Sequence, residues 1–116
     1  MHRLLAVGDY LPDVHCPLVK VTGYLLSPDP RVDGQGKRAF FEAFGFKREH
    51  PGALISALEI HGVENPVVRC RKDEWGFYWE CSGPLKCPNG REPTVKTVWI
   101  LRPGQEIPSL VTAVPD

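Results

Sequence analysis

The chain has 116 residues, 42% of them hydrophobic and 24% charged, which is the size and composition of one globular domain. Its 14 basic side chains balance 14 acidic ones, so the formal net charge is zero. This balance excludes capture of nucleic acid or anionic lipid through bulk charge and leaves room only for a locally basic site. We therefore expect a single domain over residues 1–116.

Short helices are predicted in the first half of the chain. Apolar residues recur every three or four positions over residues 17–26, 37–44 and 51–62, a spacing typical of amphipathic helices. Gly45 suits the left-handed position that ends a helix, and Pro51 is favoured in a first turn. His61 lies in the last turn of the third helix, where the helix dipole favours an imidazole, and it is also a candidate general base or acid.

Strands are predicted after Pro66, where apolar residues begin to alternate with polar ones. The expected strands cover residues 67–71, 77–81, 94–101 and 110–114, and the third is apolar on both faces, as in a central strand. The dipeptide Asn89-Gly90 predicts a tight turn. Helices followed by consecutive strands predict an α+β fold, in which N-terminal short helices precede a four-stranded antiparallel sheet with one open face.

No segment has the roughly 20 apolar residues of a membrane span or the apolar core of a secretion signal. We therefore expect a cytoplasmic protein with no membrane partner, in which the four cysteines are thiols. Cys81 and Cys87 are separated by five residues, and no Cys or His pair has the spacing typical of a zinc site. Neither a metal nor another cofactor is predicted.

The segment Gly34-Gln35-Gly36-Lys37-Arg38 has the glycines and cations of a phosphate-binding loop, but it lacks the first glycine and the final Ser or Thr of that motif. Free N–H groups at a glycine-rich helix start still bind phosphate, which makes Lys37 a candidate phosphate ligand. The alternative is a flexible loop with solvated charges.

Alternation along the strands predicts an open sheet face that carries five polar side chains: Arg69, Arg71, Tyr78, Glu80 and Lys96. Such a set suits RNA cleavage without metal, because that reaction needs a base for the 2′-hydroxyl, an acid for the leaving oxygen and cations for the phosphorane. Glu80 is the candidate base, and Tyr78 or a histidine such as His61 the candidate acid. The alternative is a solvated face of charge pairs.

Several segments resemble a family of small uncharacterised bacterial domains with a Gly-Pro-Leu turn, a Pro-Asp/Asn-Gly-Arg turn, a Thr-Val-Trp strand and a terminal Thr-Ala-Tyr-Pro. The matching segments are residues 24–26 and 37–46, Gly83-Pro84-Leu85, Pro88-Asn89-Gly90-Arg91, Thr97-Val98-Trp99 and residues 110–115. The resemblance extends from about residue 24 to residue 115.

Domains of this kind resemble toxin nucleases of the barnase–EndoU–colicin–RelE fold, in which helices precede a four-stranded antiparallel sheet. The resemblance implies a metal-independent endoribonuclease of a bacterial toxin–antitoxin or contact-toxin system, with RNA and a cognate antitoxin or neighbouring-gene protein as partners. It implies a site role for Thr112 and phosphate contacts for Arg91 and Thr97. Val114 replaces the tyrosine of the terminal motif, and the paired His and Lys of EndoU-type enzymes are missing.

A second interpretation stays open beside the nuclease. The zero net charge and the missing catalytic pair favour a non-catalytic protein-binding module, such as an antitoxin, an immunity protein or a scaffolding partner.

Overall fold

The computed structural model describes residues 5–32 and 36–116. The α-helix α1 (Leu18–Lys20) continues into the five-residue π-helix η1 (Val21–Leu25), and α2 (Lys37–Ala43) and α3 (Pro51–Glu64) follow. The strands come next: β1 (Val67–Asp73), β2 (Gly76–Pro84), β3 (Thr94–Leu101) and β4 (Ser109–Pro115). The predicted α+β fold, with helices before a four-stranded sheet, is confirmed.

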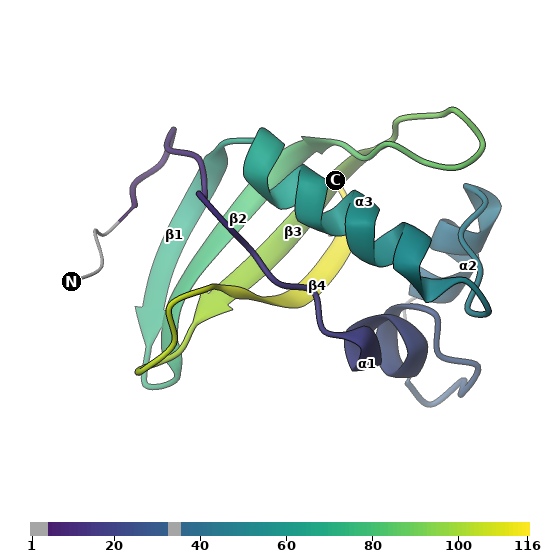
Figure 1. The fold of residues 1–116 in the computed structure, drawn as a ribbon, viewed down its shortest axis with the longest axis horizontal. Coiled ribbons are helices and arrows are strands. Elements are labelled where there is room, and N and C mark those ends of the chain that lie inside the picture. The colour runs from purple at the N-terminus through teal and green to yellow at the C-terminus, as the bar shows by residue number, and fades with distance from the viewer. Residues whose placement is uncertain (1–4, 33–35) are drawn as a thin grey trace.

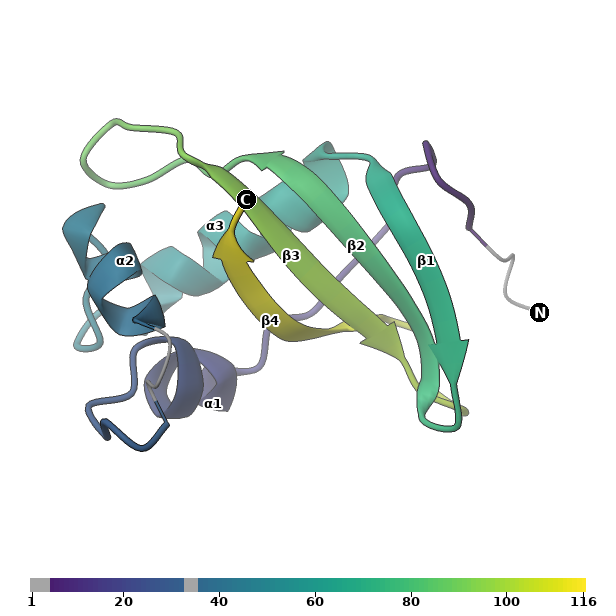
Figure 2. The ribbon, with the colours of Figure 1, turned by 180° about the vertical axis from the view of Figure 1, so that it is seen from behind.

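The sheet is an antiparallel meander in which the strands lie side by side in the order β1-β2-β3-β4. Helix α3 and the N-terminal segment cross one face, which we call the inner face (Figure 1). None of the helices of residues 5–32 and 36–116 crosses the other face, the outer face, and α1 and α2 lie to the side of β4 (Figure 2). The sheet therefore has the open face that the sequence predicts.

The core lies between the inner face and the helices, and α3 lies close against β3 at Gly62. A Cβ atom on Gly62 would lie 2.5 Å from Cζ2 of Trp99, so only glycine fits at this contact. The largest fully buried side chains of the core include Phe41, Leu54, Leu58, Trp99 and Leu110.

None of the helices in residues 5–32 and 36–116 is long and apolar enough to span a membrane.

His61 is part of a buried hydrogen-bond network in this core. Its Nε2 lies 2.8 Å from the Val95 carbonyl oxygen and 3.1 Å from that of Gly83, so Nε2 carries the proton and donates it. Nδ1 then accepts from the Thr97 hydroxyl at 3.0 Å, while Nε1 of Trp99 donates to the same hydroxyl oxygen at 2.8 Å. Burial lowers the pKa of His61 and keeps the imidazole neutral.

This network corrects two residues of the predicted site. His61 was expected as a catalytic group and Thr97 as a phosphate ligand, but both are buried on the inner face, with 2% and 0% of their surface exposed. Their polar atoms are hydrogen-bonded to each other and to the backbone of the sheet. The physical reason is parity, because Thr97 alternates with Lys96 and Val98 and so faces the helices.

Candidate active site

Four residues, one from each strand, lie next to each other across the outer face, and we call them the outer row. They are Arg69 in β1, Glu80 in β2, Val98 in β3 and Thr112 in β4. Each pair is directly opposed in an antiparallel ladder, so all four side chains share a face, and adjacent strands lie about 4.8 Å apart. Glu80 and Thr112 are therefore on the order of 10 Å apart, with Val98 between them.

A β-bulge places Arg69 in this row. Val67 pairs with Cys81, and both are buried on the inner face. Strict alternation from Val67 would put Arg69 on the inner face as well. The pairing shifts between the two residues, so that Arg69 lies opposite Glu80 instead.

A second bulge does the same for Thr112 at the other end of the row. Leu110 pairs with Trp99 and is buried in the core, so strict alternation would turn Thr112 inward. The pairing shifts between Val98 and Trp99, which brings Thr112 opposite Val98 on the outer face. Bulges that re-aim side chains are over-represented beside active sites, and here both border the same row.

Glu80 is the most buried charged group of the outer face. Its Oε2 lies 3.6 Å from Nη1 of Arg69, and its Oε1 lies 3.6 Å from Nζ of Lys96. The Glu80 side chain is 11% exposed, compared with 66% for Arg69 and 33% for Lys96. Both carboxylate oxygens thus face a cation that an incoming anion can reach from solvent.

Tyr78 lies one row further along the outer face, towards the β1–β2 hairpin. The guanidinium of Arg71 lies 3.7 Å from the centroid of its ring. Burial raises the pKa of the Tyr78 phenol, and a hydrogen bond to the Asp73 carboxylate raises it further. The phenol therefore stays protonated at neutral pH and is able to donate a proton.

At the β4 end of the row, a helix supplies a hydroxyl that the sequence did not reveal. The phenol oxygen of Tyr24, in η1, lies 3.0 Å from Oγ1 of Thr112. Nζ of Lys20 lies 5.2 Å from the Tyr24 ring centroid and 3.2 Å from the Val111 carbonyl oxygen, and Nζ of Lys37 lies 5.5 Å from the same ring. The structure thus brings the predicted phosphate ligand Lys37 near the outer row.

Tyr24 and Lys20 left only weak signals in the sequence. They are four residues apart, so a helix places them on one side, next to the buried Val21 and Leu25. That spacing does not show which strand the side of the helix meets. The contact with Thr112 depends on how η1 packs against the edge of the sheet.

Other parts of the predicted phosphate site lie elsewhere. Arg91 lies in the loop between β2 and β3, beside Phe44, and this loop projects beyond the sheet towards α2 (Figure 2). Its position corrects the expectation that Arg91 joins the site of Lys96 and Thr112. Gly34 and Gln35 of the glycine-rich segment lie outside the described residues.

The thiols do not have the properties of nucleophiles. Burial raises the pKa of Cys16 and of Cys81 to about 12 and that of Cys87 to about 11, and it also raises the pKa of Cys70. A reactive cysteine needs a lowered pKa. In the part of the chain that the structure describes, no three His, Cys, Asp or Glu side chains form a group that could hold a metal ion.

These features define the class of protein: it is an α+β domain with an open sheet face, which carries hydroxyl groups and a carboxylate that is ion-paired with two cations. Residues 10–116 match the family model described as "Domain of unknown function (DUF6883)", and the chain belongs to this family. The match includes the segments that resemble a family of small uncharacterised domains, and the description names no activity. Neither the curated proteins nor the solved structures include a match.

Proposed function

We propose that the outer face binds single-stranded RNA and cleaves it without a metal ion. The observation that carries this proposal is the outer row together with its neighbours Lys96 and Tyr24: the Glu80 carboxylate lies between two cations and across from a pair of hydrogen-bonded hydroxyls. The chain as a whole has no net charge, so this grouping is a local feature rather than a general excess of cations.

The arrangement suggests how the groups would share the reaction. A phosphodiester that lies over Val98 has Glu80 on one side and the Tyr24–Thr112 pair on the other. Glu80 accepts the proton of the 2′-hydroxyl, whose oxygen attacks phosphorus, and the bond from phosphorus to the 5′-oxygen breaks. Tyr24 gives its proton to that leaving oxygen. The products are a 2′,3′-cyclic phosphate and a 5′-hydroxyl.

Arg69 and Lys96 would act on Glu80 both in the free protein and in the complex with RNA. In the free protein they neutralise the carboxylate, and the 3.6 Å separations leave room for an anion to draw them away. A bound phosphate competes for the same cations and leaves the carboxylate free to act as a base. The cations then stabilise the extra negative charge of the phosphorane.

On this chemistry we propose that the chain is a toxin-like endoribonuclease of a bacterial toxin–antitoxin or contact-toxin system. Such an enzyme acts on RNA in the cytoplasm and needs an antitoxin to protect the cell that makes it. The nucleophile is the 2′-hydroxyl of the substrate itself, and the base, acid and cations are side chains of this chain. We therefore expect no cofactor.

Cleavage of a single-stranded RNA by the purified chain, with a chelator present, tests the proposal. Glu80→Gln keeps the size of the side chain but removes the base, and we expect it to cleave at least about 100-fold more slowly than the wild type. Glu64→Gln is a matched control, because Glu64 also lies 3.6 Å from a lysine, Lys86, but on α3. Intact RNA at micromolar wild-type protein would rule out the enzyme.

One observation favours the alternative of a non-catalytic binding module. The centre of the outer face is apolar, with Tyr78, Val98 and Ile100 packed together and charged groups around them. An apolar centre with a polar rim is typical of protein–protein interfaces. Harmless expression, together with a stable complex between the chain and a neighbouring-gene protein that Ile100→Arg abolishes, would favour an immunity-type or scaffolding role.

A further inference from the structure

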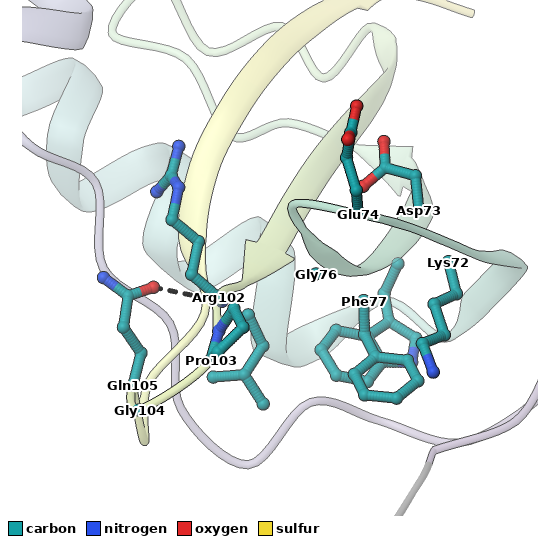
Figure 3. Close-up of a pocket in the computed structure, with 11 residues that line it drawn as sticks. Lys72, Asp73, Glu74, Gly76, Phe77, Arg102, Pro103, Gly104 and Gln105 are labelled. Carbon is teal, nitrogen blue, oxygen red and sulfur yellow. Dashed lines mark hydrogen bonds between the residues drawn. The ribbon is translucent and has the colours of Figure 1, made fainter.

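A pocket of about 490 Å³ opens on the inner face, at the end of the sheet far from α2. Its walls are the β1–β2 hairpin on one side and the loop between β3 and β4 on the other (Figure 3). The volume lies within the range of small-molecule sites, roughly 300–1,000 Å³. No residue of the outer row lines this pocket, so it is separate from the candidate active site.

The floor of the pocket is flat and aromatic. The rings of Phe77 and Trp79 are stacked, with centroids 6.3 Å apart and planes at 22°. Trp79 is 4% exposed, and its Nε1 donates to the Leu5 carbonyl oxygen, so the ring is fixed in place. Phe77 is only partly buried and leaves ring surface on which another planar ring can stack.

A lysine lies over one ring of this floor. Nζ of Lys72 lies 5.1 Å from the centroid of the Phe77 ring. Across the pocket, Oε1 of Gln105 accepts from the Arg102 backbone N–H at 3.2 Å, and Figure 3 shows the Gln105 amide nitrogen on the side away from the aromatic rings. Figure 3 shows Asp73 and Glu74 pointing away from the aromatic rings, and Arg102 pointing away as well.

We propose that this pocket binds a nucleotide. A planar base stacks on Phe77, and Lys72 attracts the phosphate. The aromatic floor and the Lys72 cation above it match a ligand with one ring system and one anionic group. The nucleotide is either free or part of an RNA strand, and both sources present the same chemistry.

Titration of the ¹⁵N-labelled chain with adenosine 5′-monophosphate, followed by NMR, tests the site. We expect saturable shifts of the amides of Lys72, Phe77 and Gln105 at millimolar nucleotide. Phe77→Ala should weaken binding by about tenfold or more, since stacking on an aromatic side chain contributes roughly 1–3 kcal/mol per base. Absence of these shifts, or equal binding by Phe77→Ala, would overturn the proposal.

Lys72→Gln separates the two halves of the ligand without touching the core. It should weaken the binding of adenosine monophosphate by roughly threefold or more and leave the binding of uncharged adenosine unchanged. Lys86→Gln, which removes a cation at the far end of the sheet, should change neither. Equal affinity of wild type and Lys72→Gln for the monophosphate would contradict the role of Lys72.

A short oligodeoxyadenylate, which lacks the 2′-hydroxyl and is not cleaved, distinguishes the two sources. If the oligonucleotide changes the amide chemical shifts of Phe77 and Gln105 at least as strongly as the monophosphate does, the ligand is part of a strand. If only the monophosphate does so, the ligand is a free nucleotide. Loss of RNA cleavage in Glu80→Gln leaves this result unaffected, because Glu80 does not line the pocket.

Discussion

Glu80 combines two properties that rarely occur together on a half-covered sheet. Its side chain is 11% exposed, yet both oxygens face cations that are more exposed than the carboxylate itself. A structural ion pair on a surface contributes only about 0–1 kcal/mol and does not require burial of the acid. In our proposal, an anion that binds the two cations uncovers this carboxylate.

Tyr24 is the residue that most sharply separates our proposal from other ways of using the outer face. If its phenol protonates the leaving oxygen, Tyr24→Phe should lower the rate of RNA cleavage by about 100-fold and leave the melting temperature nearly unchanged. Tyr10→Phe is a suitable control, because Tyr10 is 56% exposed and lies in the N-terminal segment. A wild-type rate for Tyr24→Phe, with a loss in Tyr78→Phe, would assign the acid to Tyr78 instead.

His61 makes the stability of the chain depend on pH. Burial lowers its pKa in the folded state, whereas in the unfolded chain it titrates near its ordinary value of 6.5. Between these two values the unfolded state binds more protons, so the free energy of unfolding should fall as the pH drops below about 6.5. Denaturant unfolding at pH 7 and pH 5 measures this difference.

Two variants show whether His61 is the cause. His61→Gln should reduce the difference between pH 7 and pH 5, whereas His50→Gln should keep it, because His50 is exposed just before α3. Equal wild-type stability at both pH values would mean that the folded core accepts the imidazolium.

At the scale of elements, much of the fold followed from the sequence, and the site followed less well. The period of apolar residues predicted the helices and all four strands, because burial of one face fixes that period. Alternation also predicted that Tyr78, Glu80 and Lys96 share an outer face, as the strand pairing has it. These are properties of single segments.

What the sequence did not reveal depends on contacts between segments. The two bulges beside Arg69 and Thr112 are set by pairing with neighbouring strands, and no residue pattern marks them here, although the outward position of Arg69 was itself predicted. The contact of Tyr24 with Thr112 joins residues 88 positions apart. Thr97 was assigned wrongly because the family resemblance implied a phosphate contact but did not show which face of the strand Thr97 lies on.

The contact between α3 and β3 offers a test of the packing with a control on the same helix. Gly62→Ala should lower the free energy of unfolding by about 1–3 kcal/mol, because the new methyl overlaps the Trp99 ring. A Cβ atom on Gly52 would have no neighbouring atom within 4 Å. Gly52→Ala should therefore leave the free energy of unfolding unchanged or raise it by up to about 1 kcal/mol. Equal effects of the two changes in denaturant unfolding would show that α3 does not lie so close to the sheet.

At the scale of the whole molecule, the two faces of the sheet carry different groups. The inner face holds the core and, at its open end, the aromatic pocket. In the part of the chain that the structure describes, no helix crosses the outer face (Figure 2). This face carries Arg69, Arg71 and Lys96. A chain with zero net charge can bind a polyanion only through a locally basic surface, and we propose that the outer face is this surface.

Mapping of the surface that binds an uncleavable strand tests this account most directly. The measurement is a titration of the ¹⁵N-labelled chain with a single-stranded 2′-deoxy oligonucleotide, followed by amide chemical shifts. The account predicts the largest shifts at Arg69, Glu80, Val98 and Thr112, weakening steeply with added salt. Shifts that avoid the outer face, or no shifts at low salt, would contradict it.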